Sequence, residues 1–442
     1  MLRLATPIVL AEIGWMSMGI VDTIMVGRLP NSAEAIGAVS LGSVLFYTVG
    51  VFGSGLLLGL DTLVSRAFGA GDVDDCHHSL LNSIYVSLAL APILMGLIWG
   101  LSPLLRGMGI APGVLQNALP YLRVLSWGTF PLLLYFASRR YLQGMNVVKP
   151  VVFALVSANF VNLFGNWVLI FGHLGAPAMG PVGSGWATCI SRAYMAAVLL
   201  VAIILHDRRY KTGLHLTTLR FDPARIRKLL ALGLPAAAQL TLEIGAFAVA
   251  ATMIGKLGAV QLAAHQIVIN MASLTYMVPL GIGSAAAVRV GQALGRHDAP
   301  RARDAGWTAL LLGGSFMGLM AMLFLVFPGF IVRIFTPDPF VLVTGIALLR
   351  IAAFFQIFDG LQTVVTGALR GAGDTRTSML CHLFGYWTIG LPLGYWLCFS
   401  RNLGVVGLWA GLCVALILIG IVLFGVWQRS VPATSTANVA RT

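Results

Sequence analysis

The sequence contains few charged residues, which excludes a conventional water-soluble protein. Only 10% of its 442 residues are Asp, Glu, Lys or Arg, whereas about 25% is usual for soluble domains. Hydrophobic residues make up 58% of the chain, and the mean hydropathy is +0.90. A chain with so few polar residues cannot cover a surface in water, so we expect most of that surface to face lipid.

Several sequence motifs that are typical of metal, redox and nucleotide-binding sites are also absent. The five cysteines form no CxxC pair, which argues against the usual zinc and redox sites. The acidic string DDCHH at 74–78 is better explained as a solvated turn than as a metal site. No GxxxxGK[ST] motif occurs, so we expect no direct use of ATP. We predict a protein that is not an enzyme and has no cofactor and no resident metal.

Long apolar segments recur along the whole chain. A helix needs about 20 mainly apolar residues to cross a bilayer. The sequence therefore predicts an all-α membrane protein of twelve transmembrane helices. Its first segment carries Glu12 and Asp22, which is untypical of a cleaved signal peptide. The twelve predicted spans are 5–27, 37–60, 80–101, 118–139, 151–172, 182–205, 229–254, 262–286, 306–327, 344–368, 378–397 and 403–427.

Most of the basic residues lie in the predicted loops on one side of the membrane. With both termini in the cytoplasm, twenty of the 28 Lys and Arg residues lie on the cytoplasmic side and seven lie on the outer side, while Arg192 lies inside a span. This asymmetry obeys the positive-inside rule. It explains the net charge of +13 without a nucleic-acid partner. The most basic segment, 206–228, is expected to lie against the anionic inner leaflet.

The two halves of the chain resemble each other. Residues 121–145 match 348–372 at an offset of 227, and residues 62–72 match 288–298 at an offset of 226. Each half has six spans, so the halves share one orientation and form a parallel repeat. Two pseudo-symmetric six-helix bundles around a central cavity are typical of transporters that work by alternating access. The predicted parts are an N-lobe (1–205), a basic cytoplasmic linker (206–228), a C-lobe (229–427) and a polar C-terminal tail (428–442).

Five acidic residues lie within predicted spans, although a charge at the bilayer centre costs at least about 2.5–3.5 kcal/mol. Glu243 and Asp359 each lie near the middle of a long stretch with no other charge. Such a carboxyl group can hold a proton or attract a cation, as coupling to transport requires. The other three are Glu12, Asp22 and Asp61.

The alternative to coupling is a structural role, in which a carboxylate joins helices by hydrogen bonds or pairs with an arginine. Only Arg192 is expected to lie deep enough to pair with one. For Asp61, at the inner end of its span, the structural role is favoured, and for Glu12 neither role is favoured. Three amides in the fifth span, Asn159, Asn162 and Asn166, share one helix face. They are either contacts between helices or the lining of a cavity.

Several strings resemble one known family. They include "GIVDTIMVGRL" (19–29), "AAHQIVINMASLTYMVPLGIGSAAAVRVGQALGRHD" (263–298) and "GALRGAGDT" (367–375). Over essentially its whole length the chain resembles the multidrug and toxic compound extrusion (MATE) family, in its bacterial NorM-like branch. The resemblance implies twelve helices in two lobes, and antiport of cationic or zwitterionic organic compounds against Na⁺ or H⁺.

The resemblance also implies roles for particular residues. Glu243 and Asp359 stand where the family has the C-lobe acidic residues that couple cations, and Asp22 stands where it has the N-lobe acidic residue. The residues expected around Asp22 are the polar ones Asn162, Asn166 and Thr188. Asn166 replaces an aspartate of some members, so this site is less charged here.

Three further residues are candidates for the cavity: Glu12, Gln266 and Phe355. Phe355 replaces a tyrosine of some members. The missing hydroxyl weakens the case for Na⁺ and leaves H⁺ open.

We therefore expect a monomeric antiporter of the bacterial cytoplasmic membrane, which exports amphipathic organic cations in exchange for H⁺ or Na⁺. One alternative is a lipid-linked oligosaccharide flippase of similar architecture, which would need a basic cavity for pyrophosphate. The deep residues predicted here are mainly acidic. A second alternative is a membrane-embedded hydrolase or transferase. It would need a catalytic cluster such as HExxH, and the eight histidines form none.

Overall fold

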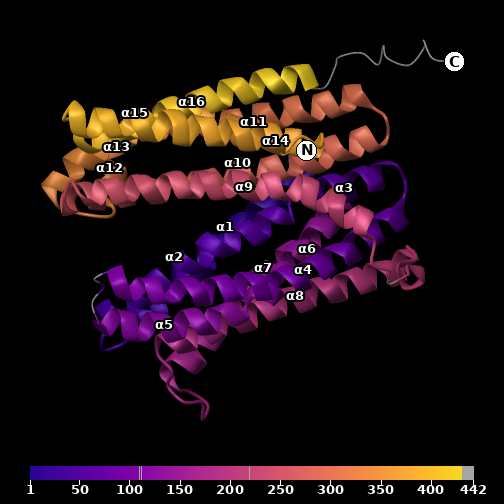
Figure 1. Cartoon of the computed structure of the whole chain (residues 1–442), viewed down its shortest axis with the longest axis horizontal. Helices are drawn as coiled ribbons and strands as arrows, with labels where there is room; N and C mark the ends of the chain where they lie inside the picture. Colours follow the sequence, from indigo (N-terminus) through magenta and orange to yellow (C-terminus); the bar gives the residue numbers. More distant parts are fainter. Residues whose placement is uncertain (109, 111, 219, 431–442) are drawn as a thin grey trace. The chain divides into compact units, whose positions relative to one another are not determined.

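The computed structural model of the protein describes residues 1–108, 110, 112–218 and 220–430 (Figure 1). Helices form nearly all of this part of the chain, and it contains no strand. The predicted polar tail, 428–442, lies outside the described residues from position 431 onward.

The first half of the chain forms eight α-helices. Short 3₁₀ helices follow α4 (η1, Ser102–Met108) and α8 (η2, Leu214–Leu216). The α-helices are α1 (Leu2–Val26), α2 (Ser32–Leu56), α3 (Gly59–Gly69), α4 (Val73–Leu101), α5 (Pro112–Trp127), α6 (Thr129–Gly144), α7 (Lys149–Phe171) and α8 (Pro181–Tyr210).

The second half is likewise helical, and two stretches of π-helix interrupt its penultimate span. These stretches are η3 (Leu383–Gly390) and η4 (Trp396–Ser400). The α-helices are α9 (Pro223–Gly255), α10 (Ala259–Gly295), α11 (Ala299–Val326), α12 (Pro328–Arg333), α13 (Pro339–Gly371), α14 (Arg376–His382), α15 (Leu391–Tyr395) and α16 (Gly404–Ser430).

The twelve predicted spans all coincide with helical segments, which confirms the predicted fold class. Within the described residues, ten helical segments are long and apolar enough to cross a membrane. The other two predicted spans, 118–139 and 378–397, consist of shorter helical pieces. The first of these breaks at Gly128, between α5 and α6. Pro131 explains the break, because it has no N–H to donate to the carbonyl of Trp127 one turn earlier.

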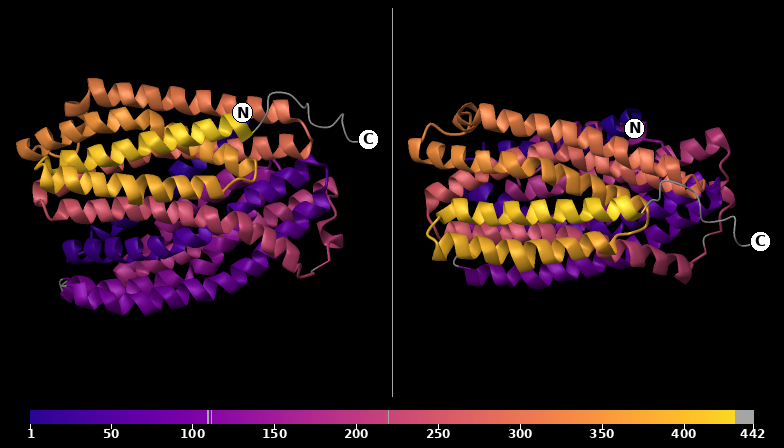
Figure 2. Two further views of the ribbon diagram at one scale, coloured as in Figure 1. Left: turned by 45° about the horizontal axis from the view of Figure 1, so that its top comes forward. Right: turned by 90° about the horizontal axis from the view of Figure 1, so that it is seen from above.

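The chain divides into two compact units (Figure 2). One comprises Leu10–Ala237, and the other comprises Met1–Val9 together with Ala238–Thr442. Helices α1 and α9 therefore each begin in one unit and end in the other. Each carries a proline just before this boundary, Pro7 in α1 and Pro235 in α9.

The N-terminal parts of α1 and α9 make equivalent close contacts, each with the unit to which that part belongs. A Cβ atom added to Gly55 of α2 would lie 2.7 Å from Cα of Ala237. A Cβ atom added to Gly281 of α10 would lie 2.9 Å from Cα of Val9. Gly55 and Gly281 are 226 residues apart in the sequence, and Val9 and Ala237 are 228 apart. The internal repeat thus preserves a close approach of two helices in each unit.

Small residues also let α10 and α13 approach each other in the second unit. Gly367 and Gly371 form a GxxxG pair on α13 and face the main chain of Gly283 and Ala287 on α10. A Cβ atom at Gly371 would lie 2.9 Å from Cα of Ala287. Small residues four apart are the usual means by which membrane helices pack closely.

We predict that Gly367→Leu destabilises the protein, because the new side chain has to occupy the space of Gly283. Its Cβ atom alone would lie 2.7 Å from Cα of Gly283. Overpacking of this kind costs about 1–3 kcal/mol or more. Thermal unfolding of the detergent-solubilised protein should show a lower Tm. Gly314→Leu is the matched control, since an added Cβ there meets no atom within 4 Å. Equal Tm values for the two variants would contradict the close packing of α10 and α13.

Candidate functional site

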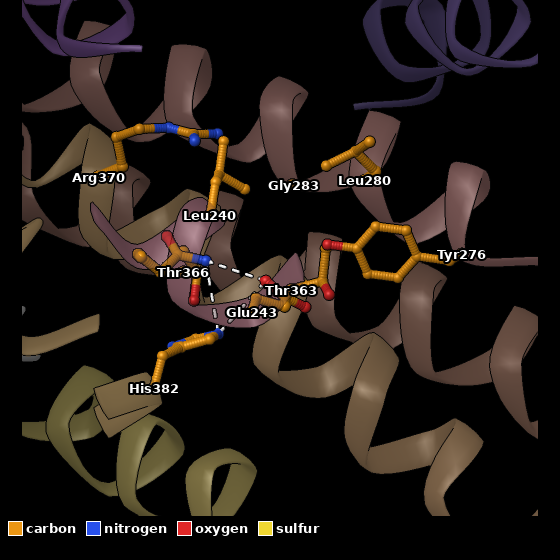
Figure 3. Close-up of a pocket in the computed structure, with 10 residues that line it drawn as sticks. Leu240, Glu243, Tyr276, Leu280, Gly283, Thr363, Thr366, Arg370 and His382 are labelled. Carbon is orange, nitrogen blue, oxygen red and sulfur yellow. Dashed lines mark hydrogen bonds and ion pairs between the residues drawn. The ribbon is translucent and has the colours of Figure 1, made fainter. Parts of the chain in front are cut away.

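A small cavity lies inside the unit that contains Ala238–Thr442, and one buried carboxylate lines it (Figure 3). Its volume is about 20 Å³, roughly the room that one water molecule needs. Four helices form its wall. They contribute Gln239, Leu240 and Glu243 from α9, Tyr276, Leu280 and Gly283 from α10, Thr363, Thr366 and Arg370 from α13, and His382 from α14.

Glu243 is the carboxylate at this cavity, and only 8% of its surface is exposed. Its Oε2 lies 3.5 Å from Nε2 of Gln239, one turn earlier on α9, and 3.6 Å from Nε2 of His382. The Nε2 atoms of Gln239 and His382 are 3.4 Å apart. Figure 3 shows Glu243 and His382 directed toward the same space. The carboxylate is thus surrounded by an amide and an imidazole.

Asp359 lies in the same region and is also 8% exposed. Its Oδ1 accepts a hydrogen bond from Nε2 of Gln362 at 3.1 Å, and that amide also lies 3.4 Å from the hydroxyl of Tyr386. Thr363, which lines the cavity, donates its hydroxyl to the main-chain carbonyl of Asp359 at 2.8 Å. Glu243 thus lines the cavity directly, and Asp359 is linked to it through Thr363. The structure places the two predicted C-lobe carboxylates in the same part of this unit.

The predicted N-lobe residues also come together, in the unit that comprises Leu10–Ala237. Asp22 of α1 is buried, and its Oδ1 accepts a hydrogen bond from Nδ2 of Asn166 at 2.7 Å. Its Oδ2 accepts a hydrogen bond from the hydroxyl of Thr188 at 2.9 Å. Asn162 joins the group through Asn166, at 3.1 Å. Asn159, expected on the same face, instead donates to the main chain of Gly14. The result is a buried carboxylate held by neutral donors from α7 and α8.

Two other membrane carboxylates have arginine partners. Glu12 forms an ion pair with Arg139, whose side chain is 1% exposed. Asp61 lies 3.5 Å from Arg140. The expectation that only Arg192 lies deep enough to pair was therefore wrong. The predicted span ended at 139, whereas α6 continues to Gly144 and holds both arginines inside the protein.

Arg192 itself interacts with neutral groups. Its guanidinium lies 4.4 Å from the centre of the Phe46 ring, and its Nη1 donates to the carbonyl of Leu125 at 3.4 Å. Neither Gln266 nor Phe355, the remaining candidates, lines the cavity. Gln266 is exposed and bonds to Asn270, while Phe355 is buried and stacks on Trp409.

Sequence reasoning missed the neighbours of the two C-lobe carboxylates, among them Gln239, His382 and Tyr386. His382 carried a signal, because an ionisable side chain within a predicted span is expensive to bury. Its partner could not be identified, since Glu243 and His382 are 139 positions apart in the sequence. Within the described residues, no group of three or more His, Cys, Asp or Glu residues could hold a metal ion.

The MatE family profile matches the chain twice, at residues 7–168 and 235–396. A protein from Mesorhizobium japonicum, described as a probable multidrug resistance protein NorM, is 35% identical over 435 residues. The match covers 97% of this chain and 93% of that protein. A protein from Burkholderia mallei with the same description is 36% identical over 452 residues, which cover 99% and 94% of the two chains.

Solved structures of similar fold are known. The eukaryotic MATE transporter AtDTX14 has a TM-score of 0.87 at 20% identity, with 97% of this chain and 96% of that chain covered. A MOP superfamily transporter from Pyrococcus furiosus has a TM-score of 0.85, also at 20% identity, with coverage of 97% and 95%. At this level of identity the likeness concerns the fold alone.

We predict that Glu12→Gln destabilises the protein, because it leaves the buried guanidinium of Arg139 without its negative partner. Breaking a buried ion pair in this way costs about 3–5 kcal/mol. A lower Tm in detergent would show the loss, and Glu34→Gln, at an exposed position of α2, is the matched control. The double variant Glu12→Gln/Arg139→Gln should recover part of the loss. A Glu12→Gln protein as stable as the Glu34→Gln protein would contradict a structural role for this pair.

Proposed function

The chain belongs to the MatE family, the multidrug and toxic compound extrusion family that its sequence resembles, and from this premise we propose that it is a multidrug efflux transporter. It exports amphipathic organic cations in exchange for H⁺ or Na⁺ by alternating access. Like its relatives it is an integral membrane protein and a member of the NorM-like branch.

One observation supports this function above the others: within the described residues, Glu243 at the cavity and the buried Asp359 near it lack the arginine partners that Glu12 and Asp61 have. Their neighbours are amides, hydroxyls and an imidazole. An ionised carboxylate in such surroundings is costly, and a bound cation or proton removes much of that cost. The loaded and empty states of the cavity therefore differ in free energy, as coupling requires.

An ion gradient provides enough energy for this cycle. One elementary charge that crosses a membrane potential of 100 mV gains about 2.3 kcal/mol. A difference of one pH unit adds about 1.4 kcal/mol per proton. When Glu243 and Asp359 take up the ion, the cavity loses negative charge and its attraction for a cationic substrate. Substrate and coupling ion thus bind in alternation.

The remaining features of the proposal follow from the sequence. We place the protein in the bacterial cytoplasmic membrane as a monomer with both termini in the cytoplasm, because the basic loops then lie inside. It is neither an enzyme nor a nucleic-acid binder. The contacts of the deep arginines argue against the flippase alternative. Arg139 and Arg140 interact with Glu12 and Asp61, and so do not form a basic cavity for pyrophosphate.

We predict that Asp359→Asn and Glu243→Gln each abolish gradient-driven transport, because neither side chain can then take up the ion. Purified protein in liposomes would be tested for uptake of a fluorescent organic cation under an imposed pH gradient and then under an Na⁺ gradient. A loss of uptake of at least tenfold is expected for both variants, and each should bind the cationic dye more weakly because it lacks one negative charge.

The matched control for this experiment is Asp304→Asn, at an exposed position of α11. It should transport like the unmodified protein. Uptake that persists in both Asp359→Asn and Glu243→Gln would rule out these carboxylates as the coupling residues. Dye that binds to the unmodified protein but moves under neither gradient would contradict the antiporter itself.

A further inference from the structure

Given the antiport proposed above, on which this inference rests, we propose that His382 and Glu243 together hold the coupling ion, and that this ion is a proton. His382 is the last residue of α14 and is 1% exposed. Its ring reaches the cavity beside Glu243. The pair joins α14 to α9, two helices that both line the cavity.

The contact of His382 with Ser378 determines which ring nitrogen can exchange a proton. Nδ1 lies 2.7 Å from the main-chain carbonyl of Ser378. A carbonyl oxygen only accepts hydrogen bonds, so Nδ1 must carry the hydrogen. In the neutral ring Nε2 is then an acceptor, and the amide of Gln239 donates to it across 3.4 Å. The nitrogen able to gain a proton is therefore the one that faces Glu243.

The approach of His382 to Glu243 is favourable only when a proton is present. Nε2 and Oε2 are 3.6 Å apart, and without a proton each atom presents a lone pair to the other. A proton on Nε2 turns this contact into a charge-assisted hydrogen bond, and a proton on Oε2 turns it into a neutral O–H···N hydrogen bond. A movement of less than about 1 Å would bring the pair to the usual distance of about 2.7–3.2 Å.

The atoms around Glu243 suit a proton better than Na⁺. Hard cations are bound by several oxygen atoms. Here Oε2 makes its hydrogen-bond and ion-pair contacts with two nitrogen atoms, those of Gln239 and His382. An amide NH₂ and a ring nitrogen can donate or receive hydrogen, but they are poor ligands for an alkali ion.

Other charged and titratable groups face the pair from each neighbouring helix. Tyr276 of α10 and Arg370 of α13 line the cavity, and Asp359 of α13 is linked to it through Thr363. Tyr386 of η3 lies beside the His382 ring, with centroids 5.7 Å apart. Helix α16 contributes aliphatic side chains such as Ile419 to the segment after His382. A single added proton removes one of the two negative charges that Glu243 and Asp359 carry when both are ionised.

His382 also connects the two carboxylates physically. The hydroxyl of Tyr386 accepts from Gln362, which donates to Asp359. Tyr386 and His382 belong to one continuous segment, in which a π-helix begins directly after His382. Short π-helical stretches often accompany functional sites. A shift of the imidazole toward Glu243 would therefore be passed through Tyr386 and Gln362 to Asp359.

The first test replaces His382 by asparagine, whose amide can still donate to Ser378 but has no counterpart of Nε2. Under a pH gradient, His382→Asn should take up fluorescent cation at least tenfold more slowly, with dye binding within twofold of the unmodified protein. The matched control is His265→Asn, since His265 is also buried in this unit but bonds to Trp409. It should transport normally. Normal uptake and an unchanged pH profile in His382→Asn would overturn the proposal.

A second measurement is independent of transport. In ¹⁵N-histidine-labelled protein in liposomes, the signal missing from His382→Asn should show hydrogen on Nδ1 at high pH and a second hydrogen on Nε2 as the pH falls. Glu243→Gln should change the pH of that transition by one unit or more. A His382 signal with hydrogen on Nε2 alone, or one unaffected by Glu243→Gln, would refute the shared proton.

The two measurements separate this inference from the proposed function. If only an Na⁺ gradient drives uptake by the unmodified protein, the antiporter stands and the proton pair is refuted. If neither gradient moves the dye, the proposed function fails, and the ¹⁵N signals still decide whether His382 and Glu243 share a proton.

Discussion

The cost of a carboxylate away from water governs the arrangement of polar residues in this protein. Five acidic residues lie within the predicted spans, and the structure satisfies them in two ways. Glu12 and Asp61 have arginine partners from α6, so their charge is compensated permanently. Asp22, Glu243 and Asp359 have amide, hydroxyl or imidazole neighbours, which tolerate both the charged and the neutral form. The first type of contact holds helices together, and the second leaves a site whose charge can change.

The internal repeat preserves the close packing of helices better than it preserves the positions of the buried acidic residues. Gly55 and Gly281 make equivalent close contacts in the two units. The acidic residues of the two buried sites do not follow the repeat: 228 positions after Asp22 the chain has Ala250, and 227 positions before Asp359 it has Leu132. The two units thus share a scaffold but hold different polar sites, one around Asp22 and one around Glu243. A transporter built in this way can assign different tasks to its two halves.

The sequence predicted the fold well because hydropathy and charge act locally along a helix. All twelve spans coincide with helical segments, and the resemblance of particular strings pointed to Glu243, Asp359 and Asp22. The polar partners were harder to predict, because they depend on contacts between distant helices. Arg139 was counted among the cytoplasmic residues at the end of its predicted span, although α6 carries it inside the protein beside Glu12. His382 lay within a predicted span, but nothing in the sequence showed that it faces Glu243.

The exchange of helix ends between the units has a consequence for synthesis of the protein. The unit that comprises Leu10–Ala237 includes the first turns of α9, and the other unit includes Met1–Val9. During translation the first unit therefore stays incomplete until the basic linker and the start of α9 have left the ribosome. Residues 1–9 are synthesised first, but the unit with which they pack is synthesised last. Neither unit can reach its final packing from its own half of the chain alone, so the packing of both units is completed only after α9 has been made.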